Sequence, residues 1–124
     1  MIEVFDEYPF TDNYPQKESF KCLLLAEVRI AGFMFNDDPY SLMYELHAGD
    51  TMELVREPDN PFDEDAIKVL NRYGNKIGYI PRRYNPVIAR LMDGGKEIYG
   101  ILERVVNYSD EPDIIMMVLM REQC

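Results

Sequence analysis

A two-residue period dominates the pattern of hydrophobic and polar positions along this chain. Residues 20–31 are continuously apolar in the middle and alternate at the end, as expected for a strand buried on at least one face. Comparable runs recur along the chain, separated by clusters of Gly, Pro, Asn and Asp that are typical of turns. The pattern predicts six strands, at residues 20–31, 51–56, 66–72, 76–80, 97–107 and 114–122.

One later stretch has the period of an amphipathic helix. Asn85 followed by Pro86 is a favourable start, because Asn caps helices and Pro is preorganised for the first turn. The next apolar residues fall on one face, and Gly94 follows the last turn. We therefore predict one main helix over about 85–94, with one or two helical turns within 40–48 as a second helical candidate.

These elements favour a single, mainly β domain. A chain of 124 residues is long enough for one hydrophobic core, and strands joined by short turns form antiparallel sheets and barrels. We expect a small six-stranded antiparallel barrel, OB-like or SH3-like, over residues 20–124. Residues 1–19 mix prolines, acids and aromatics without a clear period, so we predict an irregular N-terminal arm.

The charge of the chain is unevenly distributed. A net charge of −10 argues against a protein that coats duplex DNA through its phosphates. Residues 68–96, however, carry 7 Lys or Arg against 1 Asp or Glu, so a basic segment lies inside an acidic protein. Such a segment can capture an anion locally; the alternative is that these charges are solvated faces of strands and helix.

Composition disfavours several other classes of protein. Two cysteines, Cys22 and Cys124, do not form a disulfide framework, and together with the single His47 they predict no zinc site. We expect Cys22 in the core and Cys124 exposed. The first 20 residues lack the features of a secretory leader, and no apolar run approaches the ~20 residues of a membrane span. By exclusion, we expect a cytoplasmic protein without membrane contact, metal or cofactor.

Several motifs resemble the HIRAN domain family. They are IAGFMF at 30–35, LVREPDNPFDEDAIKV at 54–69, NKIGYIPR at 75–82 and NPVIARLMDGG at 85–95. HIRAN domains are modules of eukaryotic DNA-remodelling translocases and also occur as stand-alone or helicase-fused bacterial proteins. The resemblance implies a modified OB-like β-barrel that captures the free 3′ end of single-stranded DNA.

The resemblance also implies roles for individual residues. Phe35 and Phe62 match aromatic residues that stack on bases, and Asp63 matches a carboxylate that accepts a hydrogen bond from the terminal 3′-hydroxyl. Tyr79 matches a position near a phosphate, and Arg82 a basic residue near the backbone. The candidate nucleic-acid-binding residues are Phe35, Asn60, Phe62, Asp63, Tyr79, Arg82 and Arg83.

The residue types themselves are compatible with recognition of a strand end. A carboxylate repels a phosphodiester unless it accepts a hydrogen bond, so Asp63 opposed by Arg82 would favour a terminal hydroxyl over a phosphate within the strand. Lys76, Arg82 and Arg83 would hold phosphates and make the affinity salt-dependent. The chain departs from the family at Met34, where DNA-binding members tend to have an arginine, and so lacks one phosphate partner.

Each of these residues has a purely structural alternative. Phe35 could belong to the barrel core, and Phe62 could fold back as a hydrophobic plug of its loop. Asp63 could bond backbone amides in its own turn, as Asp often does. Tyr79 could be a cross-strand packing partner.

Three functions follow from these alternatives. The first is a non-catalytic module that binds 3′ ends of single-stranded DNA in DNA repair or processing, with a helicase or another protein as partner. The second is an acidic protein–protein interaction module. The third is Mg²⁺-dependent phosphodiester hydrolysis by Asp59, Asp63, Glu64 and Asp65, although their spacing fits no calcium or nuclease motif. We expect no catalytic residues and no enzymatic activity.

Overall fold

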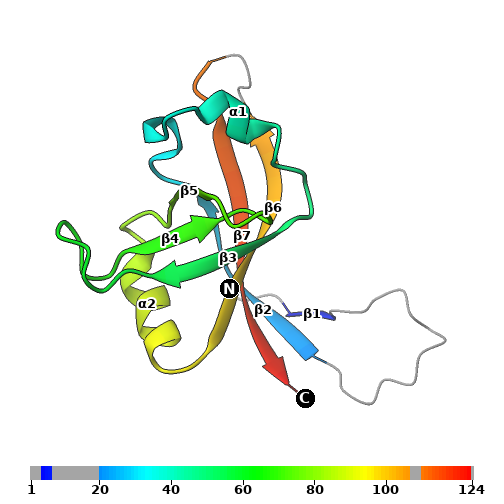
Figure 1. Cartoon of the computed structure of the whole chain (residues 1–124). Coiled ribbons are helices and arrows are strands. Elements are labelled where there is room, and N and C mark those ends of the chain that lie inside the picture. The colour runs from blue at the N-terminus through cyan, green and yellow to red at the C-terminus, as the bar shows by residue number, and fades with distance from the viewer. Residues whose placement is uncertain (1–3, 7–19, 107–109, 124) are drawn as a thin grey trace.

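The computed structural model describes residues 4–6, 20–106 and 110–123 of the chain (Figure 1). Within these residues the fold consists of strands with two α-helices and one 3-10 helix. In chain order they are β1 (Val4–Asp6), β2 (Phe20–Arg29), η1 (Phe33–Phe35), α1 (Pro39–Met43), β3 (Thr51–Arg56), β4 (Ile67–Leu70), β5 (Lys76–Tyr79), α2 (Asn85–Asp93), β6 (Glu97–Val106) and β7 (Asp113–Gln123).

The strands form one antiparallel sheet in the order β1-β2-β7-β6-β3-β4-β5. β2, β7 and β6 are long and pair along most of their length, and the shorter β3 and β4 lie across them in Figure 1. Ala31, just beyond β2, forms an isolated antiparallel bridge with Tyr79 of β5, with reciprocal N···O distances of 2.8 and 2.9 Å. The sheet therefore curls toward a barrel without closing.

The six predicted strands, their antiparallel pairing and the main helix are confirmed, but the sheet does not close into the predicted barrel. β1 was not predicted, because three residues in a segment without a period give no recognisable strand pattern; it pairs with the start of β2. The rest of the predicted arm, residues 1–3 and 7–19, and Cys124 lie outside the described residues. β4 ends at Leu70, two residues before the predicted end at residue 72. The strand stops there because the Asn71 side chain accepts hydrogen bonds from the backbone amides of Tyr73 and Asn75 and begins the turn.

The hydrophobic core lies inside the curled sheet. Its fully buried residues come from both the long and the short strands, and α2 contributes Ile88 and Ala89. Cys22 is buried, as predicted. The most deeply buried strand residues are Met52, Ile67, Val69, Ile77, Ile114, Met116 and Val118.

The helices begin with different caps. The Asp38 side chain accepts a hydrogen bond from the Ser41 amide at the start of α1. The prediction that Asn85 caps α2 is wrong, because Tyr84 occupies the cap position and Asn85 is a buried residue of the first turn. Among the helices of the described residues, none has the length and apolar character needed to cross a membrane.

Gly78 of β5 permits the close approach of the chain beyond β2, and its substitution should destabilise the fold. A Cβ at Gly78 would lie closer than 3.0 Å to the Ala31 carbonyl oxygen and to Ile30 Cγ2. We expect Gly78→Ala to lower the free energy of unfolding by about 2 kcal/mol or more, because the backbone must shift to relieve the clash. Lys76→Ala, at an exposed position of the same strand, is the control. Equal urea denaturation midpoints for the two variants would contradict this prediction.

Candidate functional site

A pocket of about 510 Å³ opens where η1, the loop 57–66, the end of β5 and the start of α2 meet. Segments far apart in the sequence contribute to its wall, from Ala31 to Asn85. Six of the seven predicted site residues line it: Phe35, Asn60, Phe62, Asp63, Tyr79 and Arg82. The seventh, Arg83, lines a different hollow.

Two exposed phenylalanines lie on the wall of this pocket. Phe35 is 94% exposed and Phe62 is 83% exposed, so neither is a core residue or a hydrophobic plug. Phe33, two residues before Phe35, fills the core instead. The Asn36 side-chain amide donates to the carbonyls of Phe33 and Ile77, which anchors η1 on β5 and leaves the Phe35 ring in solvent.

Asn60 shapes the loop that carries Phe62 and Asp63. Its side-chain oxygen accepts hydrogen bonds from the backbone amides of Phe62 and Asp63, at 2.9 and 3.2 Å. Its side-chain amide donates to Glu57 Oε1 at 3.1 Å. Asn60 thus forms a side-chain turn of the kind that Asn favours, and its polar atoms stabilise the loop.

Asp63 is held in a fixed orientation by hydrogen bonds to both carboxylate oxygens. Oδ2 accepts from the Asn85 side-chain amide at 2.8 Å, and Oδ1 accepts from the Asp65 backbone amide at 2.9 Å. The hydrogen bond from Asn85 is the main reason that the pKa of Asp63 is lowered, followed by that from Asp65 and by the charge of Arg82. The structural alternative, in which Asp63 bonds a backbone amide in its own turn, is confirmed. Because a carboxylate has about four acceptor positions, capacity remains for a ligand donor.

Arg82 adds a positive charge beside this carboxylate. Its Nε lies 3.6 Å from Asp63 Oδ2, and its Nη2 donates to the Phe62 carbonyl oxygen at 2.9 Å. The Arg82 side chain is 73% exposed, so it can contact a ligand while it steadies the loop. The pocket therefore contains one cation and one anion next to two exposed aromatic rings.

Tyr79 forms part of the pocket wall, but its hydroxyl is already engaged. The hydroxyl donates to Glu57 Oε1 at 2.8 Å, and Lys76 Nζ lies 5.1 Å from the ring centroid. Burial and then the interaction with Glu57 raise the pKa of Tyr79, so the phenol stays neutral. Burial opposes ionisation of Glu57, but the hydrogen bonds from Asn60 and Tyr79 and the charges of Lys68 and Lys76 together outweigh it and lower the pKa of Glu57.

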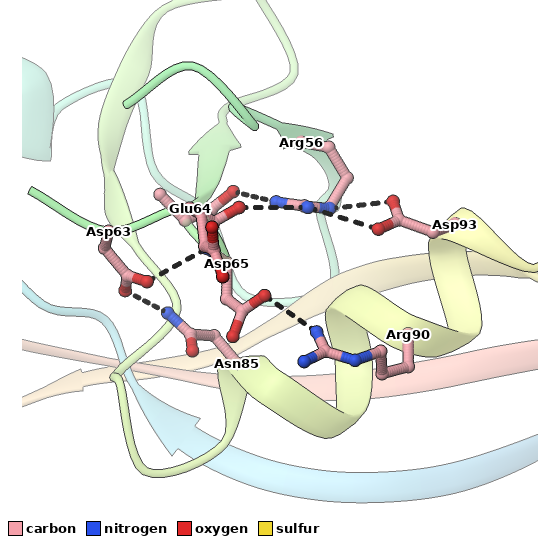
Figure 2. A network of polar contacts seen from close by, with 8 residues as sticks. Arg56, Asp63, Glu64, Asp65, Asn85, Arg90 and Asp93 are labelled. Atoms are coloured by element: carbon pink, nitrogen blue, oxygen red, sulfur yellow. Dashed lines mark hydrogen bonds and ion pairs between the residues drawn. The ribbon is translucent and has the colours of Figure 1, made fainter. Parts of the chain in front are cut away.

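A polar network ties the loop 57–66 to α2, as Figure 2 shows. Arg56 donates to both carboxylate oxygens of Asp93 at 2.9 and 3.2 Å and to two backbone carbonyls of the loop. Arg90 donates to the Asp65 carboxylate at 2.7 Å. The loop is thus held from β3 on one side and from α2 on the other.

Sequence reasoning missed Asn85 and Arg56 as parts of the site. Asn before Pro is a common helix start, and this signal gave no reason to expect a bond to Asp63. Arg56 ends a predicted strand, and nothing near it in the sequence indicates its partner Asp93. Both residues act through contacts between segments that only the fold brings together.

The carboxylates considered for magnesium binding do not converge. Asp63 faces Asn85, and the Asp65 carboxylate faces Arg90 (Figure 2). Across residues 4–6, 20–106 and 110–123, no group of three or more His, Cys, Asp or Glu side chains could hold a metal ion.

Loss of the Asn85 amide should raise the pKa of Asp63. We expect Asn85→Ala to move this pKa upward toward 3.8, because the largest cause of its lowering is removed. Since the folded-state pKa lies below the unfolded value, the stabilisation by ionised Asp63 is present above pH 3.8 and is lost as the pH falls through the folded-state pKa. NMR titration of the Asp63 carboxyl carbon measures the change. The control is Val87→Ala, at an exposed position of α2, and an equal Asp63 pKa in both variants would disprove the assignment.

Comparison with known proteins identifies relatives of this chain. A helicase-like transcription factor of Mus musculus is 46% identical over 48 residues, which cover 39% of this chain and 5% of that protein. The chain thus spans about a twentieth of the length of this relative. A crystal structure of a protein from Lactobacillus plantarum is 30% identical with a TM-score of 0.75, covering 83% of this chain and 98% of the other.

A further solved structure has a similar fold. The NMR structure of the HLTF HIRAN domain in its DNA-bound conformation has a TM-score of 0.51 at 23% identity, covering 78% of this chain and 76% of the other. The family description of the HIRAN domain matches residues 25–121. The match includes every residue that lines the pocket. On this basis, the chain belongs to the HIRAN domain family.

Proposed function

We propose that this domain is a non-catalytic module that binds single-stranded DNA and seats the 3′ end of the strand in the pocket. The observation that carries the proposal is the presence of two exposed phenylalanine rings on a hollow that also contains Asp63 and Arg82. The relative whose structure represents a DNA-bound conformation supports DNA as the ligand. As a module of this family, the domain would act in DNA repair or processing beside a helicase or another protein.

Stacking on the two phenylalanines would supply much of the affinity. A base that stacks on an aromatic side chain contributes about 1–3 kcal/mol, with little dependence on sequence. The rings of Phe35 and Phe62 are open to solvent, so a base can cover each one without displacing protein atoms. Stacking would also remove two large apolar surfaces from water.

Asp63 would distinguish a strand end from the interior of a strand. A hydroxyl that donates to a carboxylate contributes about 1.5–3 kcal/mol. A phosphate at the same place would instead meet a like charge, at a cost of ~1 kcal/mol in bulk water and about 4 kcal/mol near a protein surface. The two effects have the same direction, so a terminal 3′-hydroxyl is the preferred occupant beside Asp63.

Arg82 would hold a phosphate close to this end. DNA-binding members of the family tend to have an arginine at the position of Met34, but Met34 packs against the core. The cation that lines the pocket is Arg82. Its binding to the Phe62 carbonyl keeps the guanidinium near the pocket before a ligand arrives. Phosphate binding makes the affinity fall as the salt concentration rises.

Removal of either aromatic ring should weaken DNA binding strongly. We expect Phe35→Ala and Phe62→Ala each to raise the Kd for a single-stranded oligonucleotide by about 5- to 150-fold, corresponding to about 1–3 kcal/mol of stacking. Fluorescence anisotropy with a labelled oligonucleotide measures the Kd. Tyr44→Ala is the matched control, because Tyr44 is 85% exposed and does not line the pocket. Equal losses in all three variants would speak against stacking in the pocket.

The selectivity for the strand end should depend on Asp63. The parent protein should bind an oligonucleotide with a free 3′-hydroxyl more tightly than one with a 3′-phosphate. We expect Asp63→Ala to reduce this ratio of affinities by about tenfold, corresponding to ~1.5 kcal/mol for one charge-assisted hydrogen bond. Asp59→Ala removes an exposed acid of the same loop outside the pocket and should preserve the ratio. An unchanged ratio in Asp63→Ala would refute the role.

A further inference from the structure

A second hollow, of about 580 Å³, adjoins the pocket and has no part in the function proposed so far. Three arginines line it, Arg29 from β2, Arg83 from the segment before α2, and Arg104 from β6. The one acidic residue in its lining is Glu27. We call it the arginine hollow.

The arginine hollow and the pocket share a boundary. Ala31, which is exposed, lines both of them. Next to it, Pro81 and Arg83 line the arginine hollow, whereas Arg82 between them lines the pocket. A chain molecule that leaves the pocket over Ala31 therefore enters the arginine hollow directly.

The arginines of this hollow are available to a ligand. The Arg29 and Arg104 side chains are 66% and 52% exposed, and their ion pairs with Asp113 and Glu27 are long, at 3.7 and 3.9 Å. Exposed ion pairs contribute little and exchange readily for a better partner. Arg104 also donates a hydrogen bond to its neighbour Glu103 through Nη1, the nitrogen that faces Glu27, so its Nε and Nη2 are the atoms that the described residues leave to a ligand.

Arg83 differs from the other two arginines. Its guanidinium lies over the Tyr84 ring, 5.0 Å from the centroid, and within the described part of the chain it makes no ion pair. The ring of Tyr84 is half-buried against the core, so it limits where the guanidinium can lie. A planar guanidinium held in this way can bind a phosphate with two parallel hydrogen bonds.

The two hollows differ in charge, and this difference sets a direction for a bound strand. The pocket combines one acid with one base and suits a terminal hydroxyl. The loop 57–66, which lines part of the pocket, carries two further exposed carboxylates, those of Asp59 and Glu64, which repel a phosphate backbone. With three arginines and one glutamate, the arginine hollow is the neighbouring surface that attracts it.

We infer that the strand whose 3′ end occupies the pocket continues across Ala31 into the arginine hollow, where Arg83 and Arg104 bind its internal phosphates. The inference rests on the proposed function and extends it from an end-binding pocket to a longer track. The protein then binds the 3′ end of the strand in the pocket and the phosphate backbone at a separate site. A track of this kind matches the several nucleotides that related folds bind along a strand.

The test compares two oligothymidylates with free 3′-hydroxyls, one of about three nucleotides and one of about eight. We expect the parent to bind the longer one more tightly, since only the longer one reaches the arginine hollow. Arg83→Gln should remove much of this gain and leave the Kd of the shorter one unchanged. The plot of log Kd against log salt for the longer oligonucleotide should become shallower by about 0.7 for Arg83→Gln, and by ~1.4 when Arg104→Gln is added.

Arg72→Gln is the matched control, because Arg72 lies over the following Tyr73 ring at 5.4 Å but lines neither hollow. It should leave both affinities and the salt dependence unchanged. If the parent binds both oligonucleotides equally, or if Arg83→Gln behaves like Arg72→Gln, the track is refuted while the pocket stands. If the parent binds neither oligonucleotide, the proposed function and the track both fail.

Discussion

The guanidinium of Arg56 is the constraint on which the geometry of the pocket depends. Its side chain is only 15% exposed, and a guanidinium withdrawn from water to this extent requires hydrogen-bond partners. It finds them in Asp93 of α2 and in two carbonyls of the loop 57–66. Breaking the network would leave a charge poorly solvated, so the loop has little freedom to move away. Because Phe62 and Asp63 belong to this loop, their side chains are held in place with it.

Around this constraint the pocket combines two unfavourable features that a ligand could relieve. Phe35 and Phe62 leave large apolar surfaces in water, although the core nearby accommodates Phe33. The hydrogen bonds from Asn85 and Asp65 stabilise the ionised form of Asp63. The carboxylate therefore resists protonation and repels an approaching phosphate. A neutral donor attached to a stackable base satisfies both features at once. This combination is the reason that we propose the end of a strand, and not its middle, as the occupant of the pocket.

Motifs and sequence patterns predicted most of the residues that line the pocket, but not the contacts that each residue makes. Six of the seven predicted residues line one pocket, because the resemblance already linked their positions to a shared surface. Within that set the roles differ: Asn60 uses its polar atoms to build the loop, and Tyr79 turns its hydroxyl to Glu57. Arg83 follows Arg82 directly, yet lines the other hollow. Because Arg82 and Arg83 are adjacent and carry the same charge, the sequence gave no basis for assigning them to different hollows.

The sequence by itself determined every strand of the sheet except β1, the main helix and the turn residues, because the hydrophobic period and the preferences of Gly, Pro and Asn act over a few neighbouring residues. It also indicated six of the side chains that line the pocket. Only the tertiary structure decided that Asn85 meets Asp63, that Arg56 meets Asp93, and that Ala31 pairs with Tyr79. These partners lie 22 to 48 positions apart in the chain. Contacts over such separations depend on how the sheet curls, which no local pattern specifies.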